Sequence, residues 1–171
     1  MRRKEPSSLS IEHQWTSCYD VCSREGLPIE QRPEWFHAND AETFSVSGRV
    51  IDRRILITEN RGKATSADVE SAARLTQRIL EEGLDPGSPF DYSALRSATV
   101  GARRAFTETM RSRPRVKALI FIGVSPLMEF NVKLGRRFNV FSFDMLFAED
   151  LSSAIQTALE LLGDHDLPRE P

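Results

Sequence analysis

The sequence predicts an α/β fold, in which a mixed, mostly parallel sheet carries flanking helices and follows a helical extension. Short apolar, β-branched runs alternate with longer segments whose apolar residues recur at helical spacing, which is typical of strands joined by helices. The run VKALIFIGV (116–124) is apolar on both faces, as expected of a central strand covered by helices. A chain of 171 residues, 40% hydrophobic and 28% charged, is long enough for one domain with a real core.

Residues 1–42 are predicted to form an N-terminal extension that is only partly helical. Apolar residues recur at helical spacing over residues 10–25, and Gly26 would end that helix. Residues 27–40 contain two prolines and no clear period, which predicts an extended connector. Four aromatic residues concentrated in this part predict that it docks on the domain or on a second subunit, so a homodimer stays open: Trp15, Tyr19, Trp35 and Phe36.

The α/β domain is predicted over residues 43–163, with a polar tail over residues 164–171. It begins with two strands, TFSVSGRV and RRILITEN, which form an antiparallel hairpin around a turn at Ile51-Asp52-Arg53. Gly48 weakens the first strand and suggests a bulge.

A helix follows the hairpin, and both of its ends carry a signal. Thr65 and Asp68 fit a capping box, in which the hydroxyl and the carboxylate each accept a backbone N–H. Gly83 is expected to stop the helix. Its predicted buried stripe consists of Val69, Ala72, Ala73, Thr76, Ile79 and Leu80.

Three further strand–helix pairs complete the order β-β-α-β-α-β-α-β-α. FDYSAL is a strand, and Thr99 is placed to cap the helix after it. Ser125 is placed to cap the next helix, with Pro126 at its first position. NVFSFDMLF is the last strand, and Gly163 is expected to end the last helix. The helix after Ser125 is expected to turn four residues toward the core: Leu127, Phe130, Leu134 and Phe138.

Three short motifs within this order resemble the STAS domain superfamily, and more closely the STAS-like group similar to anti-sigma-factor antagonists. They are Asp91-Tyr92-Ser93-Ala94-Leu95 in a strand, Ala102-Arg103 near a helix start, and Gly123-Val124-Ser125-Pro126 after the central strand. The resemblance covers about residues 43–162. It implies a STAS-like fold and a non-enzymatic, cytoplasmic regulatory module of bacterial signalling. The implied partner is a protein, either a signalling kinase or an anti-sigma-like regulator.

The sequence departs from that family at the turn where its well-understood members carry D-S-S-G or D-S-T-G and are phosphorylated on the second hydroxyl residue. Here Ala98-Thr99-Val100-Gly101 stands over the motif, with Ala98 in the acidic place and Val100 in the acceptor place. The phosphoacceptor motif is therefore not intact. Ser97 and Thr99 are better explained by helix capping, where such a hydroxyl contributes about 1 kcal/mol, although phosphorylation in a shifted register stays open.

The candidate binding face is the rim at the carboxyl ends of the parallel strands, where open α/β sheets usually bind ligands. We expect loops and helix starts there to present the candidate site residues to a protein partner; an anion site or an ordinary solvated rim are the alternatives. These candidates are Arg61, Lys63, Arg96, Ser97, Thr99, Arg103 and Ser125.

Other classes of function find less support in the sequence. The net charge of −2, with basic pairs on different helices, argues against nucleic acid. No apolar run approaches the roughly 20 residues of a membrane span. Cys18 and Cys22 lack the further ligands of a zinc site and are expected in the core, so no metal or cofactor is predicted.

No nucleophile–base pair is visible, which argues against an enzyme. The alternative function is a small-ligand sensor or carrier for a lipid or a nucleotide. Its pocket would be lined by phenylalanines, although these residues are more simply explained as core: Phe106, Phe121, Phe130, Phe138, Phe141, Phe143 and Phe147.

Overall fold

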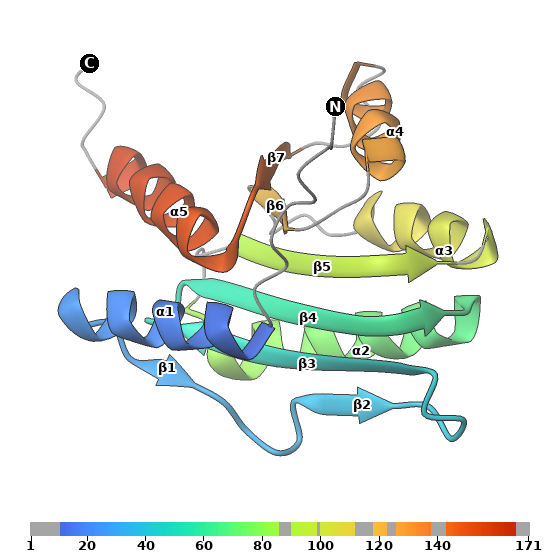
Figure 1. The fold of residues 1–171 in the computed structure, drawn as a ribbon, viewed down its shortest axis with the longest axis horizontal. Helices are drawn as coiled ribbons and strands as arrows, with labels where there is room; N and C mark the ends of the chain where they lie inside the picture. The colour runs from blue at the N-terminus through green and yellow to red at the C-terminus, as the bar shows by residue number, and fades with distance from the viewer. Residues whose placement is uncertain are drawn as a thin grey trace, which may run out of the picture.

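The protein is a mixed α/β structure. A computed structural model describes residues 11–85, 90–98, 100–111, 118–122, 126–137 and 143–166 (Figure 1). Its helices are α1 (Ile11–Arg24), α2 (Ser66–Gly83), α3 (Val100–Arg111), α4 (Pro126–Arg137) and α5 (Leu151–Asp166). Its strands are β1 (Ile29–Glu30), β2 (Phe36–Ala38), β3 (Phe44–Ile51), β4 (Ile55–Ala64), β5 (Phe90–Ala98), β6 (Ala118–Ile122) and β7 (Asp144–Ala148).

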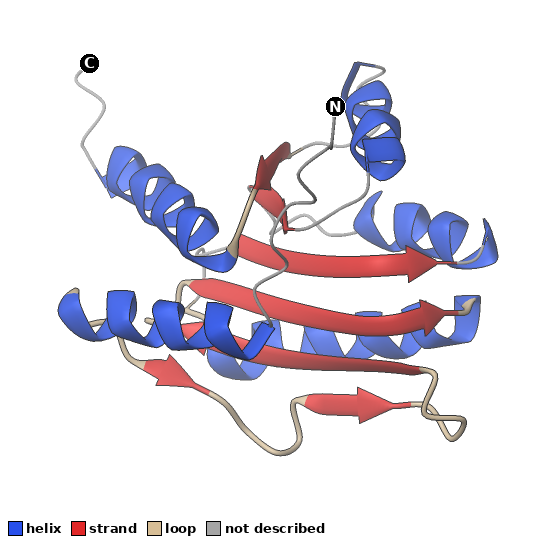
Figure 2. Cartoon of the chain, in the orientation of Figure 1, coloured by secondary structure: helices blue, strands red, loops and turns tan. Residues whose placement is uncertain are grey.

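The strands form one mixed sheet in the order β1-β3-β4-β5-β6-β7, and β2 pairs with β3 beside β1 (Figure 2). β1, β2 and β4 all run antiparallel to β3, whereas β4 to β7 run parallel to one another. The predicted antiparallel hairpin is confirmed. Its turn lies one residue later than expected, because Ile51 still pairs with Ile55, and the positive φ angles of 50° and 52° fall on Asp52 and Arg53.

The connector is more ordered than the sequence indicates, because it contributes β1 and β2 to the sheet. Ile29 pairs with Ile51, and His37 pairs with Val46. These pairings use backbone groups along one side of β3, so they need no alternation of side chains and leave little signal in the sequence.

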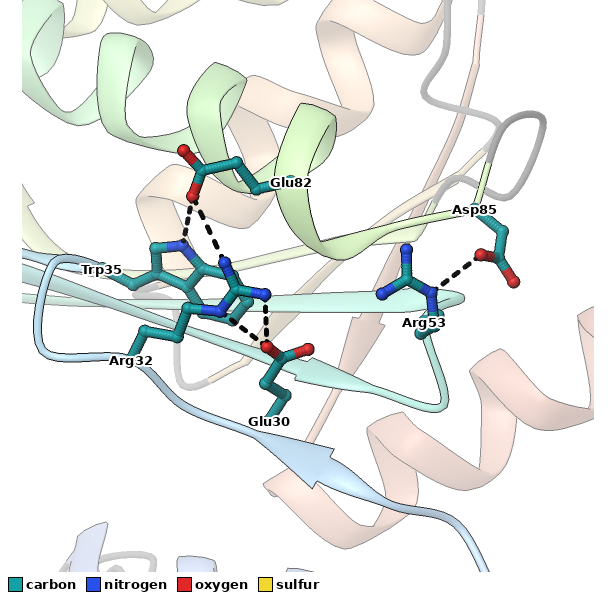
Figure 3. Close-up of polar contacts among 6 residues, drawn as sticks. All are labelled: Glu30, Arg32, Trp35, Arg53, Glu82 and Asp85. Atoms are coloured by element: carbon teal, nitrogen blue, oxygen red, sulfur yellow. Dashed lines mark hydrogen bonds and ion pairs between the residues drawn. The ribbon is translucent and has the colours of Figure 1, made fainter.

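Polar contacts hold this segment and the hairpin turn against the end of α2 (Figure 3). Trp35 Nε1 donates to Glu82 Oε2 at 3.2 Å, and Arg32 contacts the carboxylates of Glu30 and Glu82 at 2.6 and 3.7 Å. At the turn, Arg53 pairs with Asp85 at 2.8 Å.

Two hydrophobic clusters, one on each face of the sheet, place the helices in two layers. α1 and α5 cover one face (Figure 1), where the indole of Trp15 packs with Ile55 and Ile57 of β4. α2 covers the other face, where Trp35 and Leu56 belong to the second cluster and α3 packs against it. The alternation along β4 therefore divides its apolar side chains between the two layers.

Gly48 does not form the bulge that we expected, because it pairs with Thr58 in unbroken register. A Cβ atom on Gly48 would lie 2.3 Å from Cδ1 of Ile79, so this glycine allows α2 to approach β3 closely. The irregularity lies instead between Asn60 and Lys63, where β4 faces β5. There Gly62 has a φ of +87°.

The capping box at the start of α2 is confirmed, since Asp68 N donates to Thr65 Oγ1 at 3.2 Å and Thr65 N to Asp68 Oδ2 at 2.8 Å. Of the two predicted glycine stops, the one at Gly83 is confirmed, because α2 ends at this residue. An added Cβ there would lie 2.9 Å from the Trp35 ring, so Gly83 also makes room for that ring. Gly163 lies inside α5, which continues to Asp166.

The prediction that α4 turns Phe130 and Leu134 toward the core is wrong. Their side chains are 62% and 41% exposed. α4 instead brings Lys133 toward β7, with its Nζ 5.7 Å from the ring centroid of Phe147. Helical spacing identifies residues on one side of a helix, but it does not determine which side packs. The side chains of Leu127 and Phe138 lie outside the described part of the chain.

Candidate functional site

The structure places the predicted rim residues differently from the sequence-based expectation. Arg61 and Lys63 lie in β4, and Arg96 and Ser97 lie in β5, so none of the four occupies a loop. Both strands run further than their apolar centres, because backbone pairing continues to Ala64 and Ala98. Arg103 falls near the start of α3. Thr99 and Ser125, with their proposed caps, lie outside the described residues.

β4 and β5 end side by side where α2 and α3 begin (Figure 1). Lys63 pairs with Ser97 across these two strands. The starts of α2 and α3 are close to each other, since a Cβ added to Gly101 would lie 3.8 Å from Cβ of Ser66. We call residues 63–67, 96–98 and 100–104 the strand-to-helix corner.

A hydrogen-bond network fixes the corner from the side of the β2–β3 connection. Asn39 Nδ2 donates to Asp68 Oδ1 at 3.3 Å, and its Oδ1 accepts from Thr43 N at 3.0 Å. Lys63 N then donates to the Thr43 carbonyl at 3.0 Å. The end of β4 and the start of α2 are therefore both hydrogen-bonded to the β2–β3 connection.

The carboxylate of Asp68 governs the electrostatics at the start of α2. Burial alone would raise its pKa, but hydrogen bonds from the Thr65 backbone and hydroxyl and from Asn39 outweigh burial and lower it. Asp68 thus already supplies the negative charge that this helix end favours. An anion at this helix end would meet that carboxylate, which disfavours a bound anion there.

Arg61 does not join the corner, because its Nε donates to Glu59 Oε1. Glu59 is the centre of a cluster that our sequence reasoning missed. Trp15 Nε1 donates to Glu59 Oε2 at 3.0 Å, and Arg49 Nη1 lies 3.7 Å from the same oxygen. The Arg49 guanidinium also stacks 3.8 Å from the Trp15 ring centroid.

Both carboxylate oxygens of Glu59 are engaged and its side chain is only 7% exposed, so the cluster fastens α1 to the sheet. A signal for it exists in the sequence. Glu59 continues the alternation of Ile55 and Ile57, and this places a charged residue on a buried face. Such a residue needs partners brought from elsewhere in the chain.

Cys18 and Cys22 lie on the buried side of α1, within the core cluster, in agreement with the predicted packing. Burial and the neighbouring Cys22 thiol raise the pKa of Cys18, and burial raises that of Cys22. Because the thiolate is the reactive form, neither thiol is activated. Within the described ranges, no group of three or more His, Cys, Asp or Glu is arranged to hold a metal ion.

The phenylalanines proposed for a ligand pocket do not share one environment. Phe121 is buried and stacks on Phe147 with ring centroids 5.7 Å apart, whereas Phe130 is exposed. The side chains of Phe106, Phe138 and Phe141 lie outside the description.

Comparison with known proteins finds no match to a family model, a curated protein or a solved structure. In the part of the chain that the structure describes, no helix has both the length and the apolar character needed to cross a membrane. The class of protein defined by the structure is thus a mixed α/β protein with an ordered, polar corner.

Proposed function

We propose that the chain is a non-enzymatic regulatory module that binds a protein partner through the strand-to-helix corner. The observation that carries this proposal is the adjacency of the two helix starts, with Ser66 beside Gly101 and the paired residues Lys63 and Ser97 beneath them. With the resemblance to anti-sigma-factor antagonists, it supports a cytoplasmic role in bacterial signalling. The partner would be a kinase or an anti-sigma-like regulator, and no intact phosphoacceptor motif is involved.

The charge and order of the corner favour such a partner. Lys63 and Arg104 are exposed there, and the chain places Arg96 near the end of β5 and Arg103 near the start of α3. A cationic surface complements an acidic protein face and accelerates association. The Asn39–Asp68 network keeps the backbone in place, so little ordering is required when a partner binds.

The test is quantitative co-purification of the tagged full chain from bacteria that naturally produce it. Lys63→Glu, Arg96→Glu and Arg103→Glu are compared with Arg74→Glu, which reverses an exposed charge on α2 away from the corner. We expect one protein to be retained by the wild type and the control and reduced about fivefold or more by the corner variants. All four variants should keep the wild-type melting temperature. Equal retention by all four would rule out the corner as the binding face.

A further inference from the structure

α4 carries an exposed apolar ridge along one side. Pro126, Phe130 and Leu134 follow one another at intervals of four residues, and all three are exposed. In the described residues the other exposed large hydrophobic side chains, Tyr19 and Phe36, lie on separate elements. Two neighbouring large apolar side chains on one helix form a surface of the kind that marks an interaction site.

A row of cations borders this ridge. Lys133 and Arg137 are exposed and each follows a ridge residue, Phe130 or Leu134, by three positions. Glu129 pairs with Lys133 at 2.5 Å and neutralises it. Arg137 makes no ion pair with any other residue in the described ranges, so the charge of this row is positive at the carboxyl-terminal end of α4.

We propose that the α4 ridge binds an amphipathic helix of another protein, one whose apolar face is flanked by acidic residues. A partner helix with apolar residues four apart matches the spacing of Phe130 and Leu134. An acidic residue on its flank reaches Arg137. The site lies outside the corner and does not depend on the proposed function.

The charges argue against a membrane surface as the occupant. Helices that bind membranes combine a broad apolar face with several unpaired cations, whereas Glu129 neutralises one of the two cations here.

The test measures binding of the full chain to a labelled synthetic helix by fluorescence anisotropy. The helix carries leucines along one face and glutamates along its flank, and a matched peptide replaces the glutamates by lysines. The variants are Phe130→Gln with Leu134→Gln, and Arg137→Glu. Tyr19→Gln is the control, because it removes an exposed aromatic side chain from a different helix.

We expect the acidic peptide to bind about tenfold more tightly than the basic one. Loss of Phe130 and Leu134 should weaken binding about 30-fold, and Arg137→Glu about fivefold. Tyr19→Gln should bind as the wild type does, and melting curves should coincide because the substituted side chains are exposed.

Equal affinity for the two peptides, or no binding of the acidic peptide with a Kd below about 1 mM, would overturn the proposal. Binding to vesicles of phosphatidylglycerol that disappears in the Phe130/Leu134 variant would replace it with a membrane surface. A concentration-dependent dimer that disappears in that variant would replace it with self-association.

Discussion

The two tryptophans of the chain occupy matched settings that allow one interaction to be measured against another. Each indole N–H donates to a glutamate and each ring lies under an arginine: Trp15 with Glu59 and Arg49, and Trp35 with Glu82 and Arg32. The glutamates differ in burial, since the Glu59 side chain is 7% exposed and that of Glu82 is 36% exposed. We predict that the first indole–carboxylate bond stabilises the fold more than the second.

The magnitude follows from the charge of the acceptor. A hydrogen bond to a charged acceptor contributes about 1.5–3 kcal/mol and one to a neutral acceptor about 1 kcal/mol. Glu59→Gln retains an acceptor but removes its charge, and Trp15→Phe removes the donor. The double-mutant cycle should therefore give a coupling energy of about 1 kcal/mol. The equivalent cycle for Trp35 and Glu82 should give a smaller value, because solvent screens the more exposed carboxylate.

The assay is urea unfolding followed by far-ultraviolet circular dichroism, with the free energy of unfolding taken by linear extrapolation for each cycle member. The coupling energy is used because each Trp→Phe change also creates a cavity, whose cost differs between the two sites. That cost appears in both halves of a cycle and cancels. Equal coupling in the two cycles, or stronger coupling for Trp35 and Glu82, would refute the argument that burial of Glu59 sets the strength.

Three further changes test the backbone and the cap. Gly62→Ala should destabilise by about 3 kcal/mol, because φ is +87° and the new Cβ would lie 2.0 Å from the Thr43 carbonyl oxygen; an unfolding free energy within error of wild type would contradict this. Gly163→Ala should stabilise by about 0.5 kcal/mol, since the position lies in α5 with no atom within 4 Å of the new Cβ; a lower melting temperature would contradict it. The wild type should be more stable than Asp68→Asn above about pH 4, and this advantage should fall as acid protonates Asp68 below its ordinary pKa, because folding lowers that pKa. Urea titrations between about pH 6 and pH 3 measure the difference, and an advantage that grows toward acid would reverse the assigned sign.

Features that depend on neighbouring residues could be predicted from the sequence. The Thr65–Asp68 capping box needs only a four-residue pattern, and the alternation of strands and helices needs only local periodicity. The hairpin of β3 and β4 followed for the same reason. Its exact turn did not, because the pairing of Ile51 with Ile55 depends on the register of the whole hairpin.

Features that depend on distant segments could not be predicted in this way. The direction of Phe130 depends on how α4 meets β7, and the role of Gly48 depends on where Ile79 of α2 lies. The corner combines both cases. Lys63 was expected at the rim from strand order, but its place in β4 follows from backbone pairing with Ser97, and its support by Asn39 comes from the β2–β3 connection.

The separation of Trp15 and Trp35 gives the molecule one natural optical reporter in each helical layer. Trp15 belongs to the cluster beneath α1 and α5, and Trp35 to the cluster beneath α2. The chain has two tryptophans, so replacing one of them leaves tryptophan fluorescence from one layer alone. The fluorescence of the two single-tryptophan variants can therefore show which face of the sheet loses its helices first during unfolding, and no attached dye is needed.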